Sequence, residues 1–338
     1  MPHLRADGFL AVALRVWFER AGQSTDSGPG RPPQWRNIAN TSLIRETMRV
    51  MKKIFASIAA LALILGAGTA FAAQPVDWQI TLQPAATAIM EEIRWFEQYT
   101  LWFIVPITLL VMFLLAWVIV RFRASANPNP SRTSHNTLVE VIWTVGPVVI
   151  LLFLAVPSFQ LLTAQYTPDE EPSMTIKATG VQWYWDYEYQ GEEPLTFSSI
   201  MLAENDRAPL GKEDRAEYPR LLAVDNEVVV PVNTTVRVLV TASDVLHAFA
   251  MPAFGVKVDA VPGRLNEIWF KAEREGIYYG QCSELCGKDH AFMPIGVRVV
   301  SQEQYDTWLA SAQSDIGAAN RALMASINNE TNVAAAGE

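Results

Sequence analysis

The residues of this 338-residue chain that bind soft metals are gathered in one short segment. Both of its cysteines, Cys282 and Cys286, lie there, and His290 and Met293 follow closely. Thiolate and thioether sulfur select copper, imidazole suits copper as well as zinc, and a methionine is typical of a weak axial copper ligand. The segment therefore predicts a copper site that serves electron transfer.

Two cysteines four residues apart also fit other sites. An exported protein can join them as a small-loop disulfide, and they could form half of a Cys₂His₂ zinc site. A mononuclear blue-copper site needs one cysteine, two histidines and an axial ligand, so it would leave a thiolate unused. Two thiolates bridging two copper ions, each capped by His247 or His290, would use every donor, with Met293 and a backbone carbonyl as weak ligands. We favour this dinuclear arrangement.

Three segments around this loop resemble subunit II of the haem–copper cytochrome c oxidases, in a similarity that covers about Trp78 to Trp308. They are the Asp-Val-Leu-His segment that ends at His247, residues 262–266 (Pro-Gly-Arg-Leu-Asn) and residues 278–281 (Tyr-Tyr-Gly-Gln). The resemblance implies a dinuclear copper A centre with these ligands: His247, Cys282, Cys286, His290, Met293 and the main-chain carbonyl of Glu284. It also implies that the Glu284 carboxylate binds magnesium or manganese at the interface with subunit I.

The same resemblance implies the function of a proton-pumping cytochrome c oxidase subunit, with subunits I and III and cytochrome c as partners. Cytochrome c would dock near Glu188 and Asp225, and Trp183 would receive its electron. The copper would then reduce haem in subunit I, where oxygen becomes water. Glu140 would lie at the mouth of the K proton channel, although an acidic residue at a helix start also has a simple dipole explanation.

Other classes of protein share part of this pattern. A quinol oxidase subunit has a similar shape but lacks the copper ligands. Nitrous oxide reductase shares the copper A loop, but the apolar spans and the lack of a histidine-rich partner domain argue against it. A copper carrier would hold one labile ion through exposed ligands and would not need the aromatic segment around Trp183.

Two apolar runs, Leu101 to Val120 and Val141 to Ala164, are each long enough to cross a bilayer as a helix. Buried helices of a soluble core are the simple alternative, which two such runs make improbable. Arg121, Arg123 and Arg132 lie between the runs, so the positive-inside rule places this connection in the cytoplasm and the remainder outside. We therefore predict a bacterial inner-membrane protein with a transmembrane hairpin at 101–165 and a periplasmic domain at 166–310.

The beginning of the chain has the pattern of a secretory signal. Lys52 and Lys53 precede an apolar run, and the Ala-Phe-Ala sequence at 70–72, with its two small alanines, would end a signal peptide at 48–72. Residues 1–47 would then be an upstream extension or a misassigned start; an organelle presequence is the alternative, which their acidic residues argue against. Residues 73–100 would form a periplasmic N-terminal segment.

The predicted periplasmic domain alternates with a period of two. Between Val181 and Tyr189 apolar and polar residues alternate, which predicts a strand whose inward Trp185, Tyr187 and Tyr189 pack a core. Further strands are expected at 228–230, 235–241, 267–270 and 295–300, and the resemblance implies a Greek-key cupredoxin-like barrel behind the two helices. A tail at 311–338 without aromatic residues is expected to be flexible.

The domain is also strongly acidic. Residues 166–310 contain 23 acidic and 12 basic side chains, a formal charge of −11. Such a surface repels nucleic acid and attracts basic proteins. We interpret the charge as a steering field for a basic cytochrome c.

Overall fold

The computed structural model describes residues 73–168 and 170–336, with side chains up to residue 330. All of them belong to one compact unit of the chain, Gly68–Glu338. The predicted upstream extension and signal peptide lie outside the described residues.

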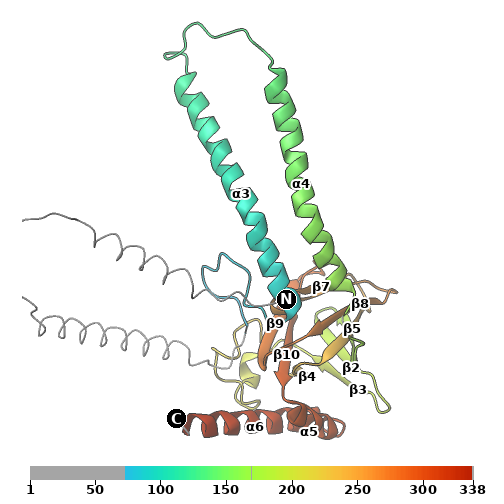
Figure 1. Cartoon of the computed structure of the whole chain (residues 1–338). Helices are drawn as coiled ribbons and strands as arrows, with labels where there is room; N and C mark the ends of the chain where they lie inside the picture. Colours follow the sequence, from blue (N-terminus) through green and yellow to red (C-terminus); the bar gives the residue numbers. More distant parts are fainter. Residues whose placement is uncertain (1–72, 169, 337–338) are drawn as a thin grey trace, which may run out of the picture. The chain divides into compact units, whose positions relative to one another are not determined.

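Two long apolar helices precede the strands of the described chain (Figure 1). Helix α3 spans Ala88–Arg121 and α4 spans Thr137–Tyr166, and both are apolar enough to cross a membrane. Thr87 caps α3 by accepting a hydrogen bond from Met90, and Asn136 caps α4 in the same way from Leu138 and Val139, which satisfies amide groups that a helix start leaves free. The predicted spans lie inside these helices and are confirmed.

Two five-stranded sheets form the domain that follows. One has the strand order β3-β2-β1-β5-β8 and the other β4-β10-β9-β6-β7. The bounds of the first are β1 Met174–Val181, β2 Tyr184–Tyr189, β3 Leu195–Ser199, β5 Thr235–Ala242 and β8 Asn266–Lys271. The bounds of the second are β4 Val228–Pro231, β6 His247–Met251, β7 Val256–Ala260, β9 Gly276–Cys282 and β10 Pro294–Val300.

Alternating side chains from both sheets fill the core between them. On β2 the buried residues are Trp185, Tyr187 and Tyr189, as the period of two predicts. Most neighbouring strands are antiparallel, whereas β1 with β5 and β4 with β10 are parallel. The predicted fold class, two membrane helices and an all-β cupredoxin-like domain, is confirmed.

The single strand predicted across 181–189 is instead a hairpin. β1 ends at Val181 and β2 begins at Tyr184, with Gln182 and Trp183 in the turn between them. The alternating pattern was misleading here because Gln182 and Trp183 are held by distant groups. Asp244 accepts a hydrogen bond from the Gln182 amide at 2.7 Å, and both side chains bond to the loop after β9.

The domain ends in two helices where a flexible tail was predicted. Helix α5 spans Gln302–Ala312 and α6 spans Ile316–Ala336. Ala319 and Leu323 of α6 are buried, and Asn320 accepts a hydrogen bond from Trp308 of α5 at 2.8 Å. The tail needs no aromatic residues of its own because it packs against those of α5.

The start of α3 is tied to the β-domain by backbone and side-chain hydrogen bonds. The Ala86 amide donates to the Ala253 carbonyl at 2.9 Å, and the Thr87 hydroxyl donates to the Phe254 carbonyl at 2.9 Å.

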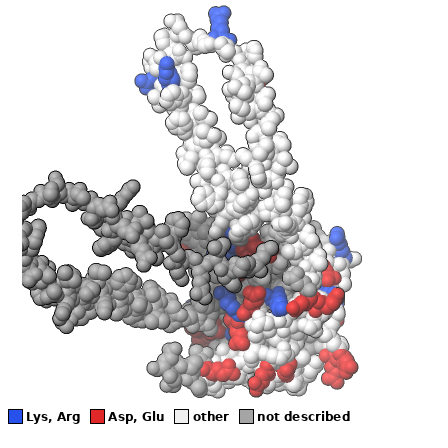
Figure 2. All heavy atoms as spheres, in the orientation of Figure 1, with Lys and Arg blue, Asp and Glu red and all other residues white. Residues whose placement is uncertain are grey.

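In Figure 2, basic side chains gather at the connection between α3 and α4, whereas acidic side chains gather on the β-domain. Both features agree with the charge pattern of the sequence.

Candidate metal centre

The predicted ligands lie at the ends of neighbouring strands of one sheet. His247 is the first residue of β6 and Cys282 the last residue of β9, and these strands pair with Phe249 opposite Cys282. The loop 283–293 carries the remaining ligands and returns directly into β10. The strands therefore bring His247 to a loop that lies 35 residues further along the chain.

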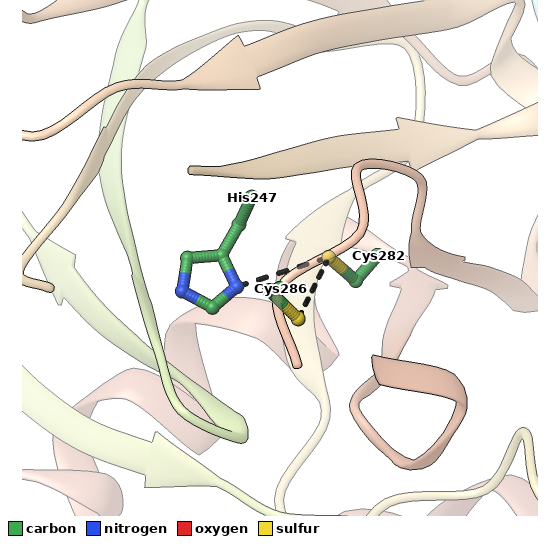
Figure 3. Close-up of side chains that lie close together, drawn as sticks. All are labelled: His247, Cys282 and Cys286. Carbon is green, nitrogen blue, oxygen red and sulfur yellow. Dashed lines mark hydrogen bonds between the residues drawn. The ribbon is translucent and has the colours of Figure 1, made fainter. Parts of the chain in front are cut away.

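The six predicted donors form two similar halves joined through sulfur. The Cys282 sulfur lies 3.8 Å from His247 Nδ1 and 3.4 Å from the Glu284 carbonyl. The two cysteine sulfurs are 3.9 Å apart. The Cys286 sulfur lies 3.5 Å from both His290 Nδ1 and the Met293 sulfur. Each cysteine therefore has one imidazole and one weaker donor beside it; Figure 3 shows His247 and both cysteines.

These distances fit a metal cluster better than a disulfide. A disulfide joins its sulfurs at about 2.05 Å, and both cysteines here are free. Donors around a tetrahedral ion with bonds of about 2.0–2.3 Å are about 3.3–3.8 Å apart, close to the spacing within each half. One zinc ion would use only four of the six donors. Two copper ions could be held by all six, and a thioether beside a thiolate is a copper donor set.

The site also favours ionisation of one thiol. Burial raises the pKa of Cys282. Hydrogen bonds with His247 and with the backbone of Glu284 and Ala248 lower the pKa by more than this, so that its value is about 6. Burial and the neighbouring Cys282 raise the pKa of Cys286. The protein alone therefore keeps one proton on the pair, and a cation would replace it because metal ligation requires both thiolates.

His247 is held in place by a residue that the sequence analysis did not identify. Asp244 Oδ1 lies 2.9 Å from His247 Nε2, which leaves Nδ1 facing the sulfur. Carboxylates commonly orient metal-binding histidines in this way. Burial lowers the pKa of His247, but its bonds to Cys282 and Asp244 outweigh this and raise it. The Asp-Val-Leu-His segment contained the signal, since an aspartate three residues before a ligand can reach it.

The ring of His247 is fully buried, and neighbouring residues of the β-domain pack closely around it. Trp185 meets it at 6.1 Å between ring centroids. A Cβ atom on Gly180 would approach the imidazole to 2.8 Å, so a side chain there would displace the ligand. The core of the domain therefore fixes this imidazole before any metal binds.

Trp183 lies against the ligand loop. Its indole Nε1 donates to the Cys286 carbonyl at 3.3 Å, and Gln182 Nε2 donates to the same oxygen at 2.7 Å. Gly287 adopts φ +127°, and a Cβ there would approach the indole to 3.0 Å. The predicted site of electron acceptance is thus in direct contact with a ligand residue.

The other predicted functional residues lie apart from this cluster. Glu140 is in the first turn of α4, where its carboxylate accepts from the Asn136 amide at 3.2 Å. Glu188 on β2 forms a cross-strand ion pair with Lys177 at 3.5 Å. Asp225 accepts from the amides of Ile200 and Asn226 at 2.7 Å each, which orders a turn. Only Glu284 belongs to the ligand loop, and its side chain is exposed.

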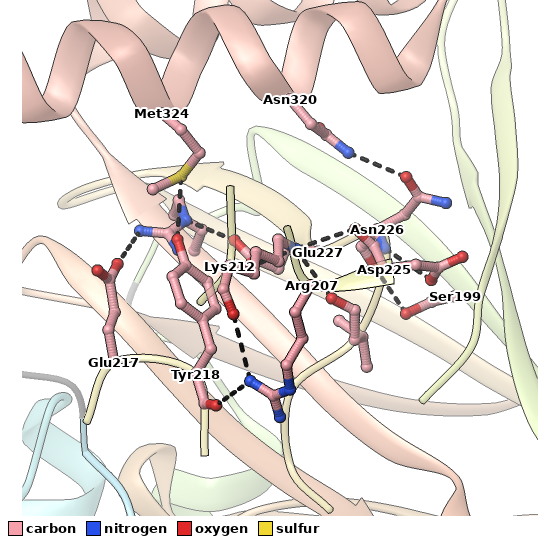
Figure 4. Close-up of polar contacts among 12 residues, drawn as sticks. Ser199, Arg207, Lys212, Glu217, Tyr218, Asp225, Asn226, Glu227, Asn320 and Met324 are labelled. Carbon is pink, nitrogen blue, oxygen red and sulfur yellow. Dashed lines mark hydrogen bonds and ion pairs between the residues drawn. The ribbon is translucent and has the colours of Figure 1, made fainter. Parts of the chain in front are cut away.

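A second polar cluster is buried elsewhere in the domain (Figure 4). Glu227 pairs with Lys212 at 2.9 Å and with Arg298 on β10. Arg298 also contacts Glu217 at 3.2 Å and the Tyr218 hydroxyl at 3.0 Å. The three central side chains are at most 5% exposed. The cluster joins the connection between β3 and β4 to β10.

Together, the apolar hairpin, the β-domain and the soft-donor cluster define a membrane protein whose His247, Cys282 and Cys286 form a group that could hold a metal ion. Residues 174–300 match the family described as cytochrome C oxidase subunit II, periplasmic domain, and residues 75–161 match its transmembrane domain. The chain therefore belongs to the cytochrome c oxidase subunit II family.

Two relatives in sequence agree with this assignment. The chain is 48% identical over 256 residues to a probable cytochrome c oxidase subunit 2 of Rickettsia felis, covering 75% of this chain and 78% of that protein. It is 46% identical over 265 residues to a Rickettsia bellii counterpart, covering 78% and 94%. A crystal structure of the periplasmic domain of subunit II of Bradyrhizobium japonicum cytochrome oxidase is 54% identical, with a TM-score of 0.39, covering 44% of this chain and 98% of that one.

Proposed function

We propose that this chain is the copper A subunit of a proton-pumping cytochrome c oxidase. It would accept electrons from cytochrome c and pass them to haem in subunit I, where oxygen is reduced to water. The arrangement of six donors in two matched halves around a pair of free thiols carries this proposal. A dinuclear copper centre, when bound there, holds one added electron shared between its ions.

The chain's own contribution is a rigid and partly enclosed set of ligands. Three of the predicted donors lie at a strand end or directly precede a strand, namely His247, Cys282 and Met293. These three side chains and that of Cys286 are buried. Packing that fixes the ligands keeps them from moving far when the charge changes. A low structural cost of electron transfer follows from this rigidity.

Trp183 supplies the route from the surface to the ligands. Its ring is partly exposed and its Nε1 is hydrogen-bonded to the carbonyl of Cys286. An electron arriving at this indole therefore needs only one hydrogen bond to reach a ligand residue. Glu188 and Asp225 would contribute to the acidic field that attracts a basic donor, more through their charge than through dedicated contacts.

Glu284 is suited to two roles through two different groups. Its carbonyl lies 3.4 Å from the Cys282 sulfur, while its side chain is exposed. An exposed carboxylate is a good ligand for magnesium or manganese. We propose that it contributes to such a site together with subunit I, in a complex that also contains subunit III.

Glu140 is proposed to lie at the K-channel mouth on the cytoplasmic side of a bacterial inner membrane. The basic connection that precedes α4 supports this orientation. The β-domain would then be periplasmic, and the chain would be exported after removal of residues 48–72.

The assembled oxidase, purified from membranes, provides the test. Metal analysis with electron paramagnetic resonance should find two copper ions in this chain that share one unpaired electron. Trp183→Phe should slow reduction by cytochrome c without changing that signal, whereas Trp78→Phe, which alters an exposed tryptophan before the helices, should have no effect. A single copper, a zinc ion or a Cys282–Cys286 disulfide in the native complex would refute the proposal.

A further inference from the structure

A single basic residue lies on the ligand loop, next to the predicted site of electron acceptance. Lys288 is the only Lys or Arg between residues 282 and 293. Its ammonium lies 5.4 Å from the centroid of the Trp183 ring, and its side chain is 77% exposed. Asp289 is its nearest carboxylate, at 3.7 Å. Lys288 therefore places an accessible positive charge against the indole.

The backbone before Lys288 is held close to the Trp183 ring. Gln182 and Trp183 both bond to the Cys286 carbonyl, and Gly287 packs directly on the indole. The backbone of the residue that follows Gly287 therefore starts close to the ring. An ammonium over the face of a tryptophan is attracted by the π-electrons, which favours the observed contact.

The charge of Lys288 opposes that of the surrounding domain. The region 166–310 carries a formal charge of −11, which would attract a basic protein from a distance. At contact, close pairs dominate because salt screens charges beyond about 10 Å at 0.1 M ionic strength. A donor that touches Trp183 must therefore accommodate a cation at the same point.

We infer that Lys288 is a specificity-determining residue of the docking surface, an inference that rests on the proposed acceptance of electrons at Trp183. It disfavours a donor protein with a lysine opposite the indole and favours one with a neutral or acidic group there. Different residues therefore attract the donor protein from a distance and select how it binds at contact. The acidic domain attracts basic donors, and Lys288 discriminates between the orientations in which they can bind.

The test uses the assembled oxidase and a soluble cytochrome c whose haem edge is rimmed by lysines. Lys288→Met keeps an unbranched stem but removes the charge, Lys288→Glu reverses it, and Lys288→Arg retains it. At low salt, Lys288→Met should raise kcat/KM about three- to tenfold, as expected for removal of one close like-charge pair in a wet interface. Lys288→Glu should raise it further, and both gains should shrink with added salt.

Binding provides a readout that does not depend on turnover. The dissociation constant for oxidised cytochrome c should fall by a similar factor in Lys288→Met, so that the change affects KM rather than kcat. Lys288→Arg should restore the salt dependence of the parent. Lys257→Met is the matched control. Lys257 is exposed on β7, two residues after Gly255, which packs against Met90 and Ile93 of α3.

Two results would overturn the inference. One is an unchanged affinity in Lys288→Met at low salt. The other is a lower kcat with altered tryptophan fluorescence, which would mean that Lys288 only positions the indole. Trp183→Phe separates this failure from failure of the proposed function: if its rate with cytochrome c equals that of the parent, electrons arrive elsewhere and the route itself is wrong.

Discussion

Two buried polar clusters in the β-domain satisfy their polar groups in opposite ways. Around Glu227, carboxylates face Lys212 and Arg298, and opposite charges lie within hydrogen-bonding range. Around Cys282 and Cys286, the atoms that face one another are sulfurs, ring nitrogens and a carbonyl, all of which carry lone pairs. The first cluster is complete within the chain, whereas the second needs protons or metal ions to bind its lone pairs.

The pKa shifts express the same difference. Burial raises the pKa of Glu227, but Arg298 and Lys212 overcome this and lower it to about 2. At the thiol pair, by contrast, ionisation of Cys282 makes ionisation of Cys286 harder. The two members of a buried ion pair stabilise each other's charge, whereas two neighbouring thiolates without a cation repel each other. The comparison indicates that the Glu227 cluster is structural and that the thiol cluster is built to bind a cation.

Removal of one sulfur should have the largest effect on the thiol cluster. Cys286→Ser should abolish the two-copper centre completely, because a serine oxygen is a poor bridging ligand for soft copper. The free energy of unfolding of the metal-free chain should change by only about 1 kcal/mol, as for an ordinary substitution. Copper analysis and paramagnetic resonance measure the first effect and thermal unfolding the second.

Ser283→Ala is the control for this substitution, since Ser283 is exposed on the same loop. It should retain both copper ions. Two ions bound per chain in Cys286→Ser would show that the sulfurs do not act as a joint bridge.

Removal of a charge from the Glu227 cluster should lower the stability of the fold but leave copper binding unchanged. Glu227→Gln leaves Lys212 and Arg298 buried with a neutral partner and should cost about 3–5 kcal/mol of unfolding free energy. Copper content should not change. Glu188→Gln, which breaks the half-exposed pair with Lys177, should cost less than about 1 kcal/mol. Equal losses in the two variants would contradict the structural role of the Glu227 cluster.

Acid should weaken the ion cluster over a defined range. The pKa of Glu227 is about 2 in the folded chain, against an ordinary glutamate value of about 4.3 in the unfolded chain. A lowered folded pKa contributes stability above the unfolded value, here about 3 kcal/mol, and this is lost as the pH falls from about 4.3 towards 2. Unfolding curves of the parent and Glu227→Gln should therefore converge in this range, and a constant difference would argue against the linkage.

The two clusters also differ in how visible they are in the sequence. Cysteines are so few in this chain that their spacing, with His290 and Met293, predicts a soft-metal site directly. Lys212, Glu227 and Arg298 belong to common residue types and are far apart in the chain. Nothing local distinguishes them from surface charges, because only the pairing of β4 with β10 brings Glu227 to Arg298.

The same reasoning explains which parts of the fold could be predicted. The membrane helices and the inward aromatic residues of β2 follow from local hydropathy and period. The turn at Gln182 and Trp183 does not, since it depends on hydrogen bonds to Asp244 and Cys286, which are distant in sequence. Local patterns therefore predict elements, whereas tertiary hydrogen bonds decide where one of them is interrupted.

Asp244 connects the turn to the predicted metal site, and its substitution should have the smallest effect. Its Oδ1 orients His247, and its Oδ2 accepts from the Gln182 amide. Asp244→Asn removes the charge and one of these acceptors but keeps the size, so copper affinity should fall about 10- to 100-fold while both ions still bind at saturation. Competition with a copper chelator measures the affinity, and Asp259→Asn on β7, whose side chain is exposed, is the control. Unchanged copper affinity in Asp244→Asn would mean that packing against Trp185 and Gly180 alone holds the imidazole. The carboxylate would then serve only to order the turn at Gln182 and Trp183.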